Sequence, residues 1–266
     1  MSTETDPLNG PPPQEVSLPR APLVRVIGQV RFSSILAVRR PEYIEPFQET
    51  IRDRYPVLRQ EHAQSITLGP QGAAARERQV AWRFAGTDDA WRVSLTPEFV
   101  ALETTAYSSR DDFLERMQAI LDAVAEHFRP AVAERVGLRY IDRVTGDELR
   151  DIPDLIRPEL LGIVKTPLRE HAQHELSEAL LALPNAGEQL RMRWAHLPSG
   201  ATVDPNAVEP ISERSWILDI DMFSDKQQSF EARSLGKSLR RFAERIYTVF
   251  RWAVTDEFLR RYGGTL

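Results

Sequence analysis

Hydrophobic and polar residues alternate along residues 23–38, the first patterned stretch of the chain. Val26, Val30 and Phe32 fall on one side of an extended backbone, while arginine, glutamine and serine fall on the other. A two-residue period of this kind predicts a strand with one buried and one solvated face. Gly28 interrupts the run and indicates a bulge or a close approach of another group.

Three longer segments repeat their apolar residues every three or four positions instead. In residues 41–55, Ile44, Phe47 and Ile51 share a face, and prolines bound the segment at both ends. The same spacing recurs over the two segments 109–129 and 231–253. We therefore predict three amphipathic helices that each pack one face against a sheet.

Strand patterns fill the space between the first two helices. Residues 57–76 are typical of a loop or a weak strand, and three clearer strands follow as far as Tyr107. The last two of these are joined by a tight turn at residues 96–98. Ser109 then stands where a helix N-cap is expected, with two aspartates in the first turn after it.

The second half of the chain shows a similar order. A strand around "GLRYIDRV" (residues 137–144) precedes a short helix at 151–162, and three strand candidates precede the last long helix. Those candidates are residues 174–183, 188–197 and 214–223. Residues 172–183 also fit a helical period, but the repeated order favours a hairpin. Thr255 caps a final short helix over residues 255–262.

This order predicts an α+β fold built from two pseudo-repeated β-α-β-β-β-α units, about residues 21–130 and 134–253. Each unit needs a helix layer over the apolar face of its strands. The expected product is one curved, mostly antiparallel sheet with the long helices on one face. In its order of elements it is similar to the saddle of the TATA-binding protein and to helix-grip folds. We expect residues 21–266 to form a single domain.

Several stretches together resemble a sporadically distributed family of uncharacterised bacterial proteins. The matching stretches are "APLVRVIGQVRF" (21–32), "FQETIRDRYP" (47–56), "LTPEFVALETTAYSSRDDFLERM" (95–117), "GLRYIDRV" (137–144), "ILDIDMF" (217–223) and "FRWAVTDEFLRRYG" (250–263). The central motif of the family usually has Asn where this chain has Asp142. The resemblance implies no catalytic residue. A sporadic distribution would suit an immunity or defence-associated accessory protein.

Composition narrows the class of protein. The chain of 266 residues has no cysteine, which excludes disulfides and thiolate chemistry and fits a cytoplasmic location. Its net charge of −5 gives no global attraction to nucleic acid or anionic membrane. We find no apolar run long enough to span a membrane and expect no cofactor. Residues 1–20, with five prolines, are typical of a disordered or extended leader.

Arginines on the solvated strand faces form the strongest candidate site. If the first strands of the two units are neighbours, the arginines of both would converge into a surface for phosphate or carboxylate groups. The alternative is a solvated face with ordinary ion pairs. The candidate residues are Arg25, Arg31, Arg139, Arg143, Arg191 and Arg193.

Other polar groups offer less. Asp219 and Asp221 share a strand face and could form a carboxylate pair, although a water-facing role is the simpler interpretation. His171 and His174 have a helical metal-ligand spacing but no third ligand, so we expect no metal site. Asp142 falls on the apolar side of its strand together with Tyr140, where a carboxylate would need a partner.

No phosphate-binding loop or nucleophile elbow is present, so the sequence leans away from an enzyme. The first hypothesis is a binding or interaction module that holds a protein partner or forms a homodimer through exposed sheet edges. The second is a binder of nucleic acid or a phosphate ligand that uses the arginines. The third is an enzyme whose site residues lie far apart in the sequence.

Overall fold

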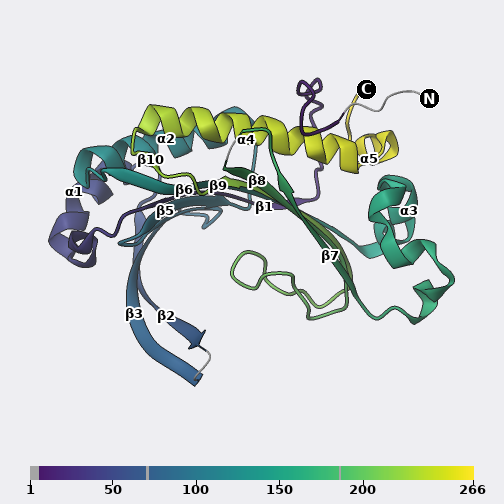
Figure 1. Ribbon diagram of the computed structural model, residues 1–266, viewed down its shortest axis with the longest axis horizontal. Coiled ribbons are helices and arrows are strands. Elements are labelled where there is room, and N and C mark those ends of the chain that lie inside the picture. Colours follow the sequence, from purple (N-terminus) through teal and green to yellow (C-terminus); the bar gives the residue numbers. More distant parts are fainter. Residues whose placement is uncertain (1–5, 70–71, 186) are drawn as a thin grey trace. The chain divides into compact units, whose positions relative to one another are not determined.

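Figure 1 shows the computed structural model, which describes residues 6–69, 72–185 and 187–266. The described strands form a sheet in the order β2-β3-β4-β5-β1-β6-β9-β8-β7, and the short β10 pairs with β6. The pairs β2–β3, β3–β4, β4–β5, β7–β8, β8–β9 and β6–β10 are antiparallel. The predicted α+β class with an open, mostly antiparallel sheet is therefore confirmed.

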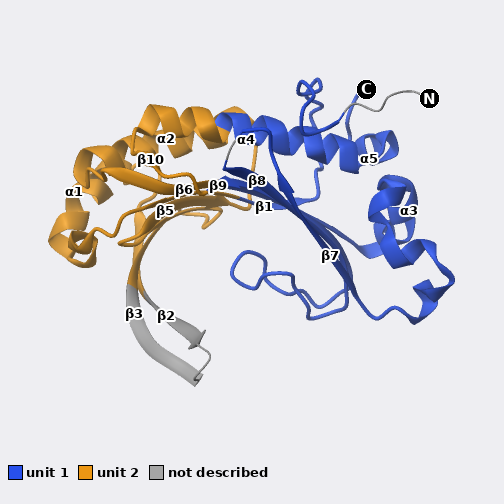
Figure 2. Ribbon diagram, in the orientation of Figure 1, with its two compact units in different colours: residues 1–26, 138–224, 240–266 blue, residues 27–137, 225–239 orange. Residues whose placement is uncertain are grey.

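The chain folds into two compact units, which Figure 2 colours separately. Unit 1 comprises Met1–Val26, Leu138–Ser224 and Arg240–Leu266, and unit 2 comprises Ile27–Gly137 and Asp225–Leu239. Strands β1 (Leu23–Phe32) and β6 (Val132–Thr145) and helix α4 (Ala232–Ala253) each pass from one unit into the other.

Unit 2 contains most elements of the first half of the chain. Besides its parts of β1, β6 and α4, its described elements are η1 (Leu36–Arg39), α1 (Pro41–Ile51), β2 (Val57–Gly69), β3 (Gly72–Ala85), β4 (Trp91–Leu95), β5 (Phe99–Thr104), α2 (Arg110–His127) and β10 (Gln228–Ser229). The segment predicted as a loop or weak strand is thus paired β structure, so four strands rather than three separate α1 from α2.

Aromatic side chains fill the core of unit 2. Phe47 on α1 lies with its ring centroid 5.4 Å from that of Phe84 on β3, and both are fully buried. Gly28 confirms the predicted close approach, because a Cβ at this position would lie 3.2 Å from the ring of Phe113. Ser109 caps α2 as predicted, since its side chain accepts a hydrogen bond from the backbone of Asp112.

Unit 1 contains the C-terminal strands and helices. Its further elements are the 3₁₀ turn η2 (Gly146–Asp151), the short α3 (Ile152–Leu155), the 3₁₀ turns η3 (Pro158–Leu160), η4 (Gly162–Lys165) and η5 (Pro167–His171), β7 (Glu175–Ala182), β8 (Glu188–Leu197), β9 (Ser215–Ser224) and α5 (Asp256–Arg261). The hairpin prediction for residues 172–183 is confirmed. The helix predicted at 151–162 is mostly a series of 3₁₀ turns.

Helix α4 packs its apolar stripe over one face of the unit 1 strands, and α5 continues this layer (Figure 1). Phe242, Ile246 and Val249 on α4 are buried, and Phe258 on α5 is fully buried. The sequence pattern predicts that the opposite face of these strands is solvated, but this face is covered. The long loop between β8 and β9, residues 198–214, lies over it and buries Val208.

Residues 6–20 contain no helix or strand but contact the helix layer of unit 1. Arg245 on α4 donates hydrogen bonds to the carbonyl oxygens of Pro7 (2.6 Å) and Gly10 (3.0 Å). The backbone N–H of Val16 donates to the hydroxyl of Tyr247 at 2.7 Å. The proline-rich segment therefore contacts α4 through residues 7, 10 and 16, and its residues 6–10 form a hydrogen-bonded turn.

Candidate functional site

Arg139, the first arginine of "GLRYIDRV", lies in a buried ion-pair network of unit 1. Its Nε and Nη2 atoms donate to the two carboxylate oxygens of Asp219, each at 2.8 Å. Its Nη1 donates to Asp204 on the loop over residues 198–214, also at 2.8 Å. Although burial opposes the charge, these two carboxylates raise the pKa of Arg139 above its usual value. A bidentate contact of this kind fixes the guanidinium plane.

Asp219 is shared between two arginines. Arg193 on β8 lies directly across from Asp219 on β9, and its Nη2 atom is 2.8 Å from the carboxylate. The Asp219 side chain has no exposed surface. The interpretation that Asp219 faces water is therefore wrong, and its carboxylate is committed to an ion pair rather than to acid–base work. The negative charge of Asp219 offsets part of the positive charge of the two guanidinium groups, which would otherwise be costly to bury.

Among the described residues, the remaining predicted arginines lie outside the contacts of Asp219, although Arg191 and Arg193 both approach the carboxylate of Glu178 at 3.9 Å. In unit 1, Arg143 donates to the carbonyl oxygen of Glu209 at 2.8 Å, and Arg191 lies over the ring of Phe223. Arg25 is half-buried in unit 1, whereas Arg31 is exposed in unit 2. The structure thus brings Arg139 and Arg193 together around one carboxylate.

Asp142 is the acid that the alternation placed on the apolar side of its strand, and it is 5% exposed. Burial, followed by the negative charge of Asp219, raises the pKa of Asp142 to about 7. No hydrogen bond to its carboxyl group is found in the described ranges. The nearby Tyr262 hydroxyl donates instead to Glu148, at 2.6 Å. Tyr140 on the same strand is half-buried.

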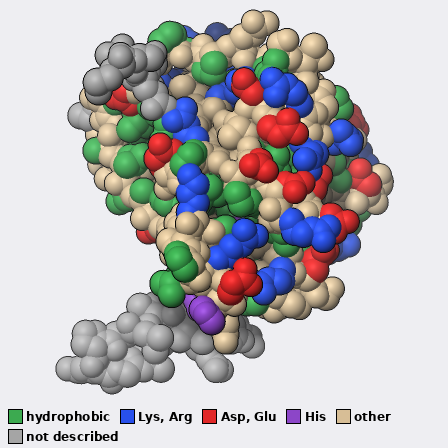
Figure 3. Space-filling model, turned by 90° about the vertical axis from the view of Figure 1, so that its right-hand side faces the viewer, with side chains coloured by type: hydrophobic (Ala, Val, Ile, Leu, Met, Phe, Trp, Pro, Cys, Tyr) green, Lys and Arg blue, Asp and Glu red, His purple; other side chains and the backbone are tan. Residues whose placement is uncertain are grey.

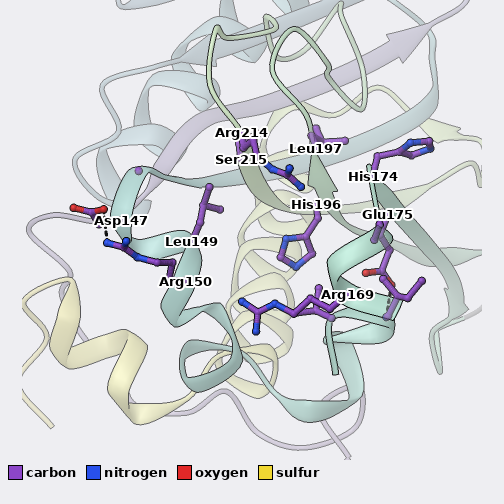
Figure 4. Close-up of a pocket in the computed structure, with 14 residues that line it drawn as sticks. Asp147, Leu149, Arg150, Arg169, His174, Glu175, His196, Leu197, Arg214 and Ser215 are labelled. Atoms are coloured by element: carbon purple, nitrogen blue, oxygen red, sulfur yellow. Dashed lines mark hydrogen bonds and ion pairs between the residues drawn. The ribbon is translucent and has the colours of Figure 1, made fainter. Parts of the chain in front are cut away.

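A concave pocket lies in unit 1 where the start of β7, the end of β8 and the start of β9 meet the 3₁₀ turns (Figure 4). We call it the strand-end pocket; its volume is about 420 Å³. Its charged and imidazole lining groups are Asp147, Arg150, Arg169, His174, Glu175, His196 and Arg214.

Glu175 and His196 are direct partners across β7 and β8, so their side chains share one face of the sheet. One carboxylate oxygen of Glu175 accepts a hydrogen bond from the backbone N–H of Ile163 at 3.1 Å. Gly162 allows this contact, because φ is +50° there and a Cβ would collide with the carboxylate. The other Glu175 oxygen is buried without a hydrogen-bond partner in the described part of the chain.

His196 projects into the strand-end pocket on the same side as Arg169 (Figure 4). Its Nε2 atom is buried and has no hydrogen-bond partner among the described residues. Burial, then the positive charges of Arg214 and Arg169, lower the pKa of His196 to about 4. The ring is therefore neutral at pH 7, and two cations lie close enough to repel its proton.

Arg169 and Arg214 form no ion pair within the parts of the chain that the structure describes, whereas Arg150 pairs with Asp147 at 2.5 Å. The pocket therefore presents two guanidinium groups without ion-pair contacts to described residues beside a buried imidazole nitrogen, and its three arginines outnumber its two carboxylates, Asp147 and Glu175. Such a site has an excess of hydrogen-bond donors and positive potential, which suits an anion.

No hydroxyl–histidine pair is formed among the described residues that line this pocket. Ser215 is buried in the lining, but within the described part of the chain neither its hydroxyl nor His196 Nε2 has a hydrogen-bond partner, so the two are not paired. Thr50 and His127 do lie 2.7 Å apart in unit 2, on exposed helix surfaces. The Thr50 hydroxyl also contacts the carbonyl oxygen of Pro46. No cluster of three potential metal ligands occurs among the described residues.

Among these lining groups the sequence pattern points only to His174, which has a metal-ligand spacing to His171. Arg169 and Arg214 lie in irregular segments, where no period reveals the direction of a side chain. Five separated segments supply the lining. The one available signal was the pairing of Glu175 with His196 across the β7–β8 hairpin. This pairing could be used only once the hairpin and its register were known.

Comparison with known proteins finds no matching family model and no matching curated protein. Within the described residues, no helix combines the length and apolar character needed to cross a bilayer.

Proposed function

We propose that this protein is a binding module rather than an enzyme, and that the strand-end pocket holds a small anionic ligand. The observation that carries the proposal is that Arg169, Arg214 and His196 line the same pocket. Among the described residues, neither arginine has an ion-pair partner, and the buried Nε2 of His196 has no hydrogen-bond partner. A carboxylate or phosphate group can accept hydrogen bonds from both guanidinium groups and, when the neutral imidazole carries its proton on Nε2, from His196 as well.

The size of the pocket agrees with a small molecule. Its volume of about 420 Å³ falls in the range of about 300–1,000 Å³ typical of ligand sites. The lining also contains Leu149, Ile163, Val164 and Leu197, which supply apolar contact beside the charged groups. The ligand we expect therefore carries one or two acidic groups on a compact apolar body.

Phosphate and pyrophosphate are suitable probes for isothermal titration calorimetry. Arg169→Ala and Arg214→Ala should each weaken binding roughly tenfold or more, because a hydrogen bond to a charged group contributes about 1.5–3 kcal/mol. Arg260→Ala is the matched control, since Arg260 is an exposed arginine of unit 1 outside the pocket. Absence of saturable binding by the unmodified protein, or equal affinity in all four proteins, would show the proposal to be wrong.

Nucleic-acid binding is the second function that the arginines suggest. On the face shown in Figure 3, basic and acidic side chains are interspersed. Arg139 and Arg193 are both held by Asp219. These observations favour a small anion in the pocket over a polyanion on the sheet, because nucleic-acid surfaces are typically continuous basic patches.

We infer further that the two halves of the chain are pseudo-repeats of a curved, helix-grip-like sheet. The strand order supports this: outward from the neighbours β1 and β6 come β5 and β9, then β4 and β8, then β3 and β7. These are the strands at equivalent places in the two halves. An experimental structure in which residues 21–130 and 134–253 do not superpose would refute the inference.

We also propose the setting that the family resemblance implies: a bacterial, cytoplasmic accessory protein of an immunity or defence system. The absence of cysteine supports a reducing compartment. A binding role suits an accessory protein. Fractionation of the native host and the identity of the adjacent genes test this setting separately from the ligand.

A further inference from the structure

Strand β7 stands at the end of the strand order and pairs with β8 alone. In an antiparallel pair, every second residue directs its N–H and C=O groups away from the partner strand. No backbone hydrogen bond from these outward groups is found in the described part of the chain. The outer edge of β7 therefore offers a row of free donors and acceptors.

This edge lacks two of the features that usually protect edge strands, proline and a bulge, and its charged residues are Glu175 and Glu178. Residues 175–182, "ELSEALLA", contain neither proline nor lysine. Their pairing with β8 runs through all eight residues without a register shift. Leu176 and Leu180 are 53% and 54% exposed, which is unusual for leucine. Natural sheets block such edges with charge, proline or bulges. Here Glu178 supplies one charge, but exposed leucines lie on both sides of it, so the edge indicates a strand partner.

We propose that the partner is a second copy of this chain, which adds antiparallel to β7 about a two-fold axis at Glu178. A two-fold axis perpendicular to the sheet leaves each side chain on its own face. A residue of one copy and the residue opposite it in the second copy then have numbers that are both odd or both even. The residue at the axis therefore lies opposite its own counterpart. Only the axis at Glu178 sets Leu176 against Leu180 of the second copy, and it does so twice.

The charges around the axis are compensated within each copy. Glu178 lies directly across from Arg193 on β8, and its carboxylate is 3.9 Å from both Arg191 and Arg193. Two glutamates that meet at the axis therefore bring four guanidinium groups with them on the same face. This arrangement offsets the repulsion expected between like charges on opposed residues.

Disulfide formation tests both the partner and the register, because the chain has no natural cysteine. In Glu178→Cys, the two introduced thiols face each other across the axis at the Cα separation of an antiparallel pair, about 4.5–5.5 Å, within disulfide reach. Mild oxidation should give a covalent dimer. Ala182→Cys is the matched control on the same face, where the two thiols lie far apart and should stay monomeric on a denaturing gel.

Sedimentation velocity supplies the second measurement. The unmodified protein should be a dimer at micromolar concentration, and Leu180→Asp should shift it to monomer. Leu36→Asp, at a leucine that is 64% exposed in unit 2, should leave the dimer intact. A monomeric unmodified protein, a dimer unchanged by Leu180→Asp, or equal cross-linking at residues 178 and 182 would each overturn the proposal. None of these outcomes bears on the strand-end pocket, so the two proposals fail separately.

Discussion

Asp142 is an acid placed on the side of β6 that packs against helices, with Leu138 and Val144 as buried neighbours on the same face. Burial favours the protonated carboxyl group, and the charge of Asp219 adds to this effect. Its pKa of about 7 means that it gains and loses its proton near neutral pH in the folded protein. The position is therefore a source of instability that depends on pH.

Asp142→Asn should stabilise the protein more at pH 8 than at pH 5. The folded-state pKa of about 7 lies above the unfolded value near 3.8, so the unfolded chain releases the proton first as pH rises. The free energy of unfolding then falls between these pH values, by up to about 1.4 kcal/mol per pH unit, and stays low above pH 7. Asparagine keeps the shape and removes the titration.

Urea denaturation of both proteins at pH 5 and pH 8 measures this effect. Asp53→Asn, at an exposed aspartate of unit 2, is the control for the change in charge. A stability difference between Asp142→Asn and the unmodified protein that is the same at both pH values would contradict the prediction.

Alternation along β6 predicted part of its burial pattern, but Tyr140 on the predicted buried face is half-buried and Ile141 on the other face is fully buried. Leu138, Asp142 and Val144 are buried, as their spacing predicts. The surroundings of Arg139 could not be predicted, because its second carboxylate comes from Asp204 in a loop without any period. Local pattern specifies the direction of a side chain, whereas its partner depends on contacts distant in sequence.

At the scale of elements, helix α5 is connected to α3 through one threonine. Thr255 caps α5 by accepting a hydrogen bond from the N–H of Phe258 at 3.3 Å. Its hydroxyl also donates toward the carbonyl oxygens of Asp154 (2.8 Å) and Leu155 (3.1 Å) at the end of α3. Ser109 caps α2 through the single contact with Asp112. The two caps therefore differ in how many elements they join.

Thr255→Ala should cost more stability than Ser109→Ala. Loss of an ordinary N-cap costs about 1 kcal/mol, and loss of the α3 contact adds about 0.5–1.5 kcal/mol. Thr255→Ser keeps the hydroxyl and should retain most of the stability. Chemical denaturation of the three variants compares them directly, and a Thr255→Ala effect no larger than that of Ser109→Ala would show that the link to α3 contributes nothing.

Elements themselves were predictable where the period was long or the cap was clear, as for α2, α4 and α5. Residues 172–183 were ambiguous because their leucines and alanines fit two periods equally well. Pairing with β8 decides the outcome, through contacts that no local pattern contains. The segment 151–171 has apolar residues at helical spacing, but prolines at positions 153, 158 and 167 divide it into short turns.

At the scale of the molecule, the N-terminal and C-terminal segments meet within unit 1. The N–H of Arg20 donates to the carbonyl oxygen of Tyr262 at 3.2 Å. A Cβ on Gly264 would lie 2.8 Å from Val16 and 2.9 Å from Leu18. The leader expected from composition is thus in contact with the end of the chain. It also contacts α4, because backbone carbonyl oxygens of a segment without helix or strand can still accept hydrogen bonds from Arg245.

Deletion of residues 1–20 should speed hydrogen exchange in the part of α4 beyond residue 240 and in α5, since hydrogen bonds to Arg245 and Tyr247 are lost. Gly264→Leu offers a cross-check. It should destabilise the complete chain more than the shortened chain, because the conflicts with Val16 and Leu18 are lost on deletion, whereas the conflict with the Leu259 carbonyl oxygen remains. Equal destabilisation of both chains would contradict this arrangement.

The interleaving of the two units has a consequence for biosynthesis. A ribosome releases the chain from its N-terminus at about 5–20 residues per second. Unit 2 needs residues up to Leu239 and unit 1 needs residues up to Leu266, yet unit 1 also includes the first 26 residues. Unit 2 can therefore be completed only after residue 239 has been made, and unit 1 only after residue 266. Strands β1 to β5 can pair with one another once residue 104 has been made, but the edge of β1 that pairs with β6 stays open until β6 follows. Holding chaperones could protect this edge during that interval.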